Sequence, residues 1–295
     1  MKYLVLAILL LSGAAQADWR AAPVKHTDYP EDIVIEERAP APGGFPNGLL
    51  AERGSGDIRK AWYADPTERY RHGILGDAIE AGMLMVETET GEGLAFTLPV
   101  DEVFEDRYPR LADLDGDGSV EVVAIRSSLD LGGSVTVYGL AGGELVQKAT
   151  TPFIGLSNRW LNVAGIADFD GDGAQEIAYV KTPHIGGTLI LYGYRGGDLV
   201  QLTDLWGFSN HAIGATEMRL SAVVDLDGDG DLEIALPSAD RRALRIMDLS
   251  DGRWREIAAV ELPGRVDRAI RVEGEGATTS FILGLATGIV VVVSR

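Results

Sequence analysis

The chain has 295 residues, of which 45 are acidic and 26 are basic, and its formal net charge at pH 7 is −19. Such an acidic protein is not expected to bind nucleic acid or anionic membrane surfaces. The sequence contains no cysteine, which excludes disulfides, thiol nucleophiles and a lipid-anchored N-terminal cysteine.

The N-terminus has the pattern of an export signal. A charged residue, Lys2, precedes an apolar run at Tyr3–Leu11, and Ala15-Gln16-Ala17 has the small residues of a cleavage site. We therefore expect residues 1–17 to be a signal peptide and the protein to be periplasmic or extracellular. The apolar run is well short of the roughly 20 residues needed to span a bilayer, so membrane insertion is not expected.

The next segment, residues 18–47, contains Ala39-Pro40-Ala41-Pro42-Gly43-Gly44. Proline and glycine in this density favour an extended, partly flexible leader. Residues 48–295 remain for one folded domain.

The most specific feature of the chain is a nine-residue pattern of acids and glycines that occurs three times. Aspartates occupy positions 1, 3 and 5, glycine occupies position 6, and glutamate occupies position 9. Such oxygen ligands surround one hard cation, and the glycine permits the turn that brings in the backbone carbonyl of position 7. We expect three Ca²⁺ ions. Their ligands would be Asp113, Asp115, Asp117, Ser119 and Glu121; Asp168, Asp170, Asp172, Ala174 and Glu176; and Asp225, Asp227, Asp229, Asp231 and Glu233, with position 7 contributing its carbonyl and the Asp231 side chain pointing outward.

The three loops recur at intervals of about 55 residues, which is typical of stacked repeat units. Around the second loop, β-branched and aromatic runs alternate with turn residues and predict four strands per unit. Helical periodicity is absent there, so we expect an all-β propeller. The strands predicted in the three central units lie at 121–126, 134–138 and 144–149; at 161–167, 175–181, 187–193 and 198–204; and at 232–237, 243–248 and 253–260.

Both ends of the repeat region are degenerate. Arg71–Met85 has the place of a unit without any ligand set, and the last unit has Arg271 where the first ligand should be. We expect Arg271 to pair with Glu273 or Glu275 in place of a metal. The last unit offers three strands, so an N-terminal strand at Asp57–Tyr63 is predicted to complete it and close a ring of five blades; six or seven blades are the alternatives.

The repeated Asp-x-Asp-Gly-Asp-Gly-x-x-Glu loops, each between predicted strands, resemble the FG-GAP/VCBS-type repeats of integrin α-subunit propellers and of many exported bacterial proteins. The resemblance covers about residues 50–295. It implies a calcium-stabilised β-propeller used for adhesion or ligand binding, and it implies no catalytic residues. Arg271 departs from the pattern, so a fourth calcium site is not expected.

No other motif for chemistry is present. The four histidines have no zinc-binding spacing, and His72 and His184 are interpreted as ordinary loop or core residues. The connections between blades repeat a group of polar and aromatic residues suited to a binding surface. The favoured interpretation is structural: the tryptophans wedge between blades, and the serines and asparagines cap turns. The candidate binding residues are Ser157, Asn158, Arg159, Trp160, Trp206, Asn210 and His211.

Two functional classes follow from these observations. The first is a non-catalytic binding or adhesion scaffold for a protein or carbohydrate partner. The second is a periplasmic hydrolase or lyase with its active site on one face of the propeller, because 45 acids can place two carboxylates together without any sequence signature.

Overall fold

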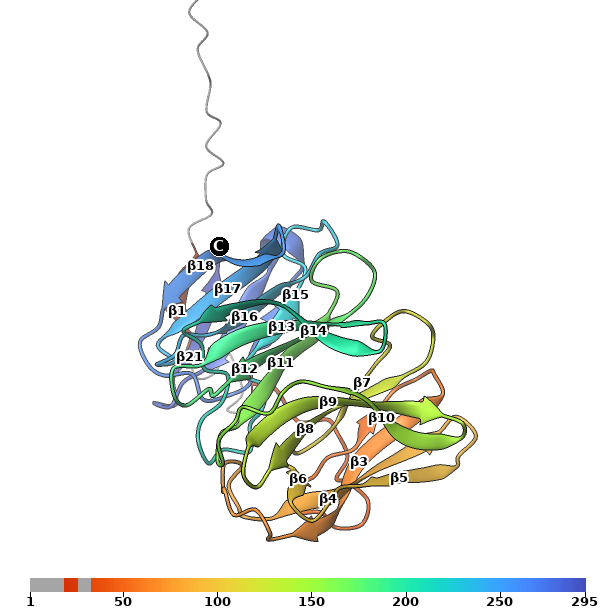
Figure 1. The fold of residues 1–295 in the computed structure, drawn as a ribbon. Coiled ribbons are helices and arrows are strands. Elements are labelled where there is room, and N and C mark those ends of the chain that lie inside the picture. The colour runs from red at the N-terminus through yellow and green to blue at the C-terminus, as the bar shows by residue number, and fades with distance from the viewer. Residues whose placement is uncertain (1–18, 26–32) are drawn as a thin grey trace, which may run out of the picture.

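Short runs of β-branched and aliphatic residues between glycine turns fold into antiparallel strands throughout the chain. The computed structural model describes residues 19–25 and 33–295, so the predicted signal peptide lies outside the described residues. These residues form 21 strands and a single 3₁₀ turn, Gly276–Thr278 (Figure 1). The prediction of an all-β fold is confirmed.

Three of the sheets have four strands each, and a fourth sheet has nine. The nine-stranded sheet consists of two four-stranded series joined by β6 (Glu102–Phe104), which pairs with one strand of each series. The first series contains β2 (Ala51–Glu52), β3 (Ile58–Thr67), β4 (Glu80–Thr88) and β5 (Gly93–Thr97), and the second contains β7 (Arg110–Ala112), β8 (Glu121–Ser128), β9 (Gly132–Ala141) and β10 (Glu144–Thr150).

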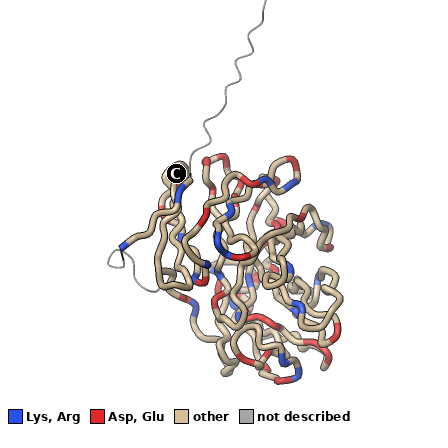
Figure 2. Tube along the Cα trace, turned by 90° about the vertical axis from the view of Figure 1, so that its left-hand side faces the viewer, with Lys and Arg blue, Asp and Glu red and all other residues tan. Residues whose placement is uncertain are grey.

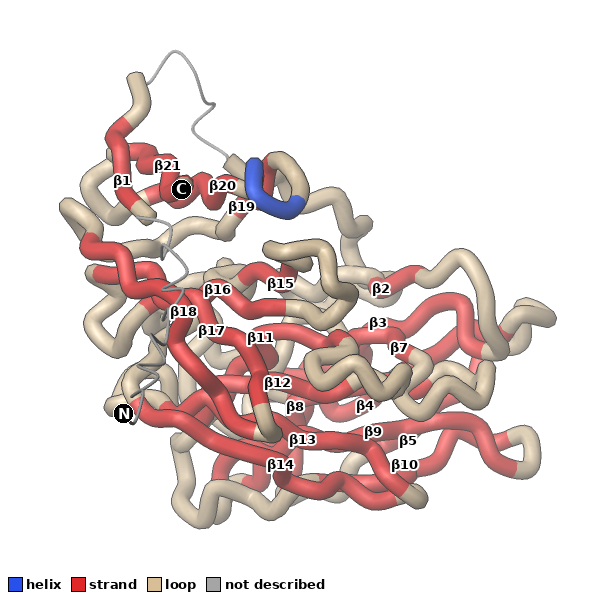
Figure 3. Tube along the Cα trace, turned by 90° about the horizontal axis from the view of Figure 1, so that it is seen from above, coloured by secondary structure: helices blue, strands red, loops and turns tan. Residues whose placement is uncertain are grey.

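The remaining sheets follow in chain order (Figure 3). The third series is β11 (Leu161–Ala167), β12 (Glu176–Lys181), β13 (Thr188–Arg195) and β14 (Asp198–Trp206). The fourth is β15 (Ala222–Val224), β16 (Glu233–Pro237), β17 (Ala243–Ser250) and β18 (Arg253–Glu261). The fifth is β19 (Arg271–Glu273), β20 (Ser280–Gly284), β21 (Val290–Ser294) and, from the other end of the chain, β1 (Arg20–Pro23).

The N-terminal strand that completes the last sheet is β1, and not Asp57–Tyr63 as predicted from the sequence. β1 pairs antiparallel with β21, with Ala22 opposite Val292. Residues 58–63 instead belong to β3, between β2 and β4, so the first series begins at Ala51 and not near residue 71. The error arose because β2 has only two residues and gives no periodic signal.

The described part of residues 18–47 is more structured than the extended, partly flexible leader that the sequence predicted. β1 lies within it, Ile33 packs against Ile282 and Val290, and Phe45 is buried with residues of the first series. Among the described residues, no strand pairing joins the fifth series to the first.

Consecutive sheets bury their apolar faces against each other. Trp160 and Leu161 of the third series pack with Val135 and Val137 of the second, and Phe169 packs on Trp254 of the fourth at 5.6 Å between ring centroids. These layers fix the position of the loops at both ends of the strands.

Because the strands are antiparallel, successive connections lie at opposite ends of each sheet. The β7–β8, β11–β12 and β15–β16 loops share one end, here called the acidic end. The β3–β4, β10–β11, β12–β13 and β14–β15 connections share the other, here called the histidine end. The seven residues of β11 separate the two ends by about 20 Å.

Candidate functional site

The acidic end carries loop one (residues 113–121), loop two (168–176) and loop three (225–233). Loops one and two have similar internal geometry. Acidic residues recur at many bends of the chain (Figure 2). In loop one the Gly118 N–H donates to Asp113 at 3.1 Å, and in loop two Gly173 donates to Asp168 at 2.9 Å. These bonds fold each loop around its first carboxylate, as the glycine at position 6 predicts, because both glycines have positive φ.

The glutamate at position 9 is anchored in each loop by a backbone N–H at position 2. Leu114, Phe169 and Leu226 donate to Glu121, Glu176 and Glu233 at 3.0, 3.0 and 2.7 Å. Burial, together with the neighbouring aspartates, raises the pKa of each glutamate to about 7, even though the backbone hydrogen bond lowers it. A cation in the loop would offset the repulsion between the glutamate and the neighbouring aspartates.

The loops have the donor set for a metal ion. Carboxylate oxygens of Asp113, Asp115 and Glu121 lie within 4.8 Å of one another, and so do those of Asp168, Asp170 and Glu176. Within the described residues, Asp113 Oδ1, Asp168 Oδ1 and Glu176 Oε1 are buried without a hydrogen-bond partner. Buried carboxylate oxygens need compensation, so the residues present fit a hard cation.

Loop three is arranged differently. Its group of close oxygens comes from Asp225, Asp227 and Asp229, without Glu233. Asp225 accepts from Gly228 at 2.6 Å and not from the glycine at position 6. The Asp231 side chain, which was expected to point outward, reaches the neighbouring loop, where its Oδ1 takes up the space that a Cβ on Gly171 would need.

Two arginines, one beside loop two and one in the fifth series, pair with acids. Arg195 lies 3.3 Å from both Asp170 and Asp172 in loop two. Arg271 lies 2.8 Å from Glu273, which confirms the predicted pair, although both residues belong to strand β19 and not to a loop.

A cavity of about 290 Å³ opens at the histidine end. We call it the histidine pocket. Its lining comes from the β3–β4, β10–β11, β12–β13 and β14–β15 connections, and the lining residues are His72, Ile74, Asn158, Arg159, Trp160, Thr182, His184, Ile185 and Ile213.

The backbone of the pocket wall is strained at Thr182. Its φ of 51° lies in the left-handed region that β-branched residues avoid, whereas asparagine tolerates the similar φ of 55° at Asn158. Strain of this kind is concentrated at functional sites.

On one side of the pocket, His72 contacts a buried carboxylate. His72 Nδ1 lies 2.5 Å from Oε1 of Glu105, and the Ser127 hydroxyl donates to Oε2 at 2.5 Å. Glu105 follows β6 directly and is fully buried, and its carbonyl accepts the indole N–H of Trp160 at 2.9 Å. Burial raises the pKa of Glu105, while His72 and Ser127 oppose the rise.

On the other side, two histidines pack on Trp160. The His184 ring is parallel to the indole at 6.1 Å, and His184 Nε2 lies 3.0 Å from Nδ1 of His211. Nε2 of His211 lies 3.0 Å from the Ala215 carbonyl. Burial lowers the pKa of His184 to about 4 and of His211 to about 3, so both rings are neutral at pH 7.

The structure separates the predicted binding residues into three groups. Asn158, Arg159 and Trp160 line the pocket, although Trp160 is only 2% exposed. Ser157 precedes them, and His211 lies behind His184. Asn210 is buried, is not part of the pocket lining and exchanges hydrogen bonds with Asn162, and Trp206 is 67% exposed beside Gly186.

Sequence reasoning missed His72, His184 and Glu105 as members of one site. They are far apart in the chain and share no motif spacing. The only available signal was that His184 and His211 fall in predicted connections at the same end of the sheets.

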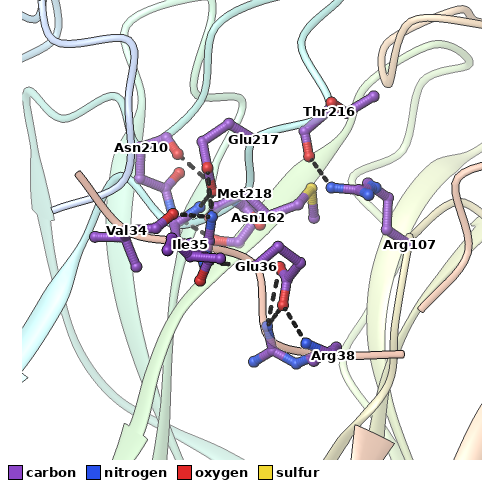
Figure 4. Close-up of polar contacts among 11 residues, drawn as sticks. Val34, Ile35, Glu36, Arg38, Arg107, Asn162, Asn210, Thr216, Glu217 and Met218 are labelled. Carbon is purple, nitrogen blue, oxygen red and sulfur yellow. Dashed lines mark hydrogen bonds and ion pairs between the residues drawn. The ribbon is translucent and has the colours of Figure 1, made fainter. Parts of the chain in front are cut away.

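A second cavity, of about 410 Å³, lies where the inner strands meet and includes Arg38, Arg110 and Arg219 in its lining. These cations already have partners: Glu36, Asp106 and Glu217 respectively. Figure 4 shows the segment from Val34 to Arg38 beside Met218, with Glu36 directed at Arg38. A fourth arginine, Arg53, also lines the cavity, so three of its four arginines are paired with acids.

Exposed apolar residues are concentrated at the histidine end. Of the nine large hydrophobic side chains that are exposed among the described residues, seven lie in its loops or at the strand end next to them. They are Val100, Leu131, Leu156, Ile185, Trp206, Ile213 and Ile289. Gathered exposed apolar side chains are typical of interaction surfaces.

Comparison with known proteins agrees with the repeat. Residues 113–179 match the family model of an FG-GAP-like repeat, so the chain contains an FG-GAP-type repeat across loops one and two. A search of curated protein sequences returned no significant match. No helix that could cross a membrane occurs in the described part of the chain.

Among solved structures, the chain is similar to rhamnogalacturonan lyase YesW, with a TM-score of 0.50 and 16% identity over 90% of this chain and 50% of that one. It is also similar to the exotype rhamnogalacturonan lyase YesX, with a TM-score of 0.45 and 15% identity over 85% of this chain and 56% of that one. The chain thus spans about half the length of these proteins. At this identity, the first similarity shows a shared fold alone.

Proposed function

We propose that the protein is an exported, calcium-binding β-propeller of five blades that acts as a non-catalytic binding module, and that its ligand is a carbohydrate. The observation that carries the proposal is the histidine pocket, which combines an apolar wall with a few polar groups at the end of the sheets opposite the acidic loops. Small-molecule sites have this composition, whereas protein partners usually cover flatter surfaces.

Calcium has a structural role in this proposal. Oxygen-only ligands in flexible loops favour Ca²⁺ over zinc or copper. The loops are about 20 Å from the pocket along β11, so the ions would act by ordering the sheets and not by touching the ligand.

The metal part is tested with Asp113→Ala. Calorimetry should find three Ca²⁺ ions per wild-type chain and two in the variant. At calcium 100 times above its dissociation constant, losing one site should cost about 2.7 kcal/mol of unfolding free energy. Asp130→Ala, in the β8–β9 turn at the other end, should bind three ions, and equal ion counts in all three proteins would contradict the proposal.

The ligand part is tested on a glycan array, followed by titration calorimetry of the best binder. Ile213→Thr at the pocket should weaken binding about tenfold or more, because it removes apolar contact with the ligand. Val200→Thr, at another exposed apolar position on the outer strand β14, should bind like the wild type. Identical affinities of the two variants would place the site elsewhere.

An enzyme is the second candidate, favoured by the contact between His72 and Glu105, since a carboxylate behind an imidazole is a common arrangement for a general base. The similar structure YesW is described as a rhamnogalacturonan lyase. Release of unsaturated products from pectic polysaccharides, lost in His72→Ala, would support this candidate over the binding module.

A further inference from the structure

We propose that His72 is the residue that selects the ligand, by accepting a hydrogen bond at Nε2 from a ligand hydroxyl group. This inference rests on the proposed carbohydrate binding and adds the polar group that is recognised. A chain of contacts runs behind the pocket from Ser127 through Glu105 to His72.

The chain of contacts sets the tautomer of the imidazole. Glu105 is fully buried and accepts the Ser127 hydroxyl on one oxygen, which leaves the other oxygen as an acceptor for His72. A carboxylate facing Nδ1 holds the proton on Nδ1. Nε2 then carries the lone pair.

The imidazole is held in place as well as oriented. The Glu105 backbone is fixed by the indole N–H of Trp160, and the Tyr70 ring meets the His72 ring edge-on at 5.8 Å. The Tyr70 hydroxyl in turn accepts the Asn158 N–H at 2.8 Å, which joins the His72 wall to the β10–β11 connection. His72 is therefore a preorganised acceptor and not a mobile surface histidine.

The rest of the pocket suits a neutral ligand that carries hydroxyl groups. Ile74, Ile185 and Ile213 supply the apolar contact that the C–H face of a sugar ring requires. His184 is neutral at pH 7. Arg159 already donates one guanidinium N–H to the Asn158 carbonyl at 3.2 Å.

The variant that tests the proposal is His72→Asn. The asparagine amide can replace Nδ1–H as the donor to Glu105 but places no acceptor where Nε2 was. We expect affinity for the best glycan of the array to fall at least tenfold with an unchanged melting temperature. Val200→Thr serves as the control and should keep wild-type affinity.

Nitrogen NMR of the histidine rings supplies a second readout that needs no glycan from the array. At pH 7.5 we expect His72 to be protonated at Nδ1 alone, and methyl glycosides of glucose, galactose and rhamnose, used as probes up to 100 mM, to shift the Nε2 resonance. A proton on Nε2, or wild-type affinity in His72→Asn, would overturn the inference while leaving carbohydrate binding intact. A wild-type protein that binds no glycan would overturn both.

Discussion

Individual buried carboxyl groups differ in whether the fold keeps them charged. Glu105 and Asp106 are fully buried but have partners, in His72 and Ser127 for the first and Arg110 for the second. Glu80 is almost as deeply buried, and burial together with the nearby Glu105 raises its pKa to about 10. The carboxyl of Glu80 is therefore protonated in the folded protein at neutral pH.

Replacement of Glu80 by glutamine should stabilise the protein above neutral pH. The folded pKa exceeds the unfolded value, so the folded state holds a proton that the unfolded state has lost, and wild-type stability falls as pH rises from about 4.5 to 10. Glu80→Gln removes this loss, and we expect a gain of roughly 1–3 kcal/mol at pH 8 with little change at pH 4.5. Urea unfolding at both pH values measures it.

The control for this experiment is Glu92→Gln in the exposed β4–β5 turn. It should change the urea midpoint little, and equally at both pH values. A Glu80→Gln protein that is less stable than wild type at pH 8 would show that Glu80 is charged in the fold.

At the residue scale, the sequence predicted the acidic loops but not the histidine pocket. The ligands of each loop lie within nine residues, so their spacing alone identifies the chemistry. His72 and Glu105 meet because β6 bridges the first and second four-stranded series, a pairing that no local pattern announces.

At the scale of strands, prediction succeeded where turns are regular. The four strands of the third series were placed within two residues of their observed ends, since glycine turns and acidic loops bound each of them. Prediction failed at the two ends of the fold. β1 has only four residues, and its partner β21 lies at the opposite end of the chain.

Removal of β1 should weaken the last sheet and expose its edge. A chain starting at Val24 would leave β21 unpaired on one side and would lose the contact of Trp19 with Phe281. Loss of these hydrogen bonds and contacts should cost roughly 2–4 kcal/mol. The free edge should also promote aggregation. Melting temperature and light scattering measure both effects.

A chain starting at Trp19 is the matched control, because it lacks the preceding residues but keeps β1. It should match the melting temperature of the protein that retains residues 1–18. If both truncations were equally stable, β1 would contribute nothing to the closure of the last sheet.

For the whole molecule, the distribution of charge matters more than its total. Much of the net charge of −19 comes from the three acidic loops, which share one end of the fold and approach one another. Gln175 of loop two donates to the Leu114 carbonyl of loop one at 2.8 Å, and Asp231 of loop three reaches Gly171 of loop two. Carboxylates therefore repel one another both within each loop and between neighbouring loops.

This arrangement predicts opposite responses to salt with and without calcium. In a chelator, added NaCl should raise the melting temperature, because at 0.1 M the Debye length of about 10 Å screens repulsion between neighbouring loops. In saturating calcium the loop charges are largely neutralised, so the same salt should change the melting temperature little or lower it by weakening surface ion pairs. Thermal melts across 10–500 mM NaCl in both buffers measure the difference. Parallel curves in the two buffers would mean that the loops hold no cation, or that their repulsion does not limit stability. Calcium counts from calorimetry distinguish these two explanations.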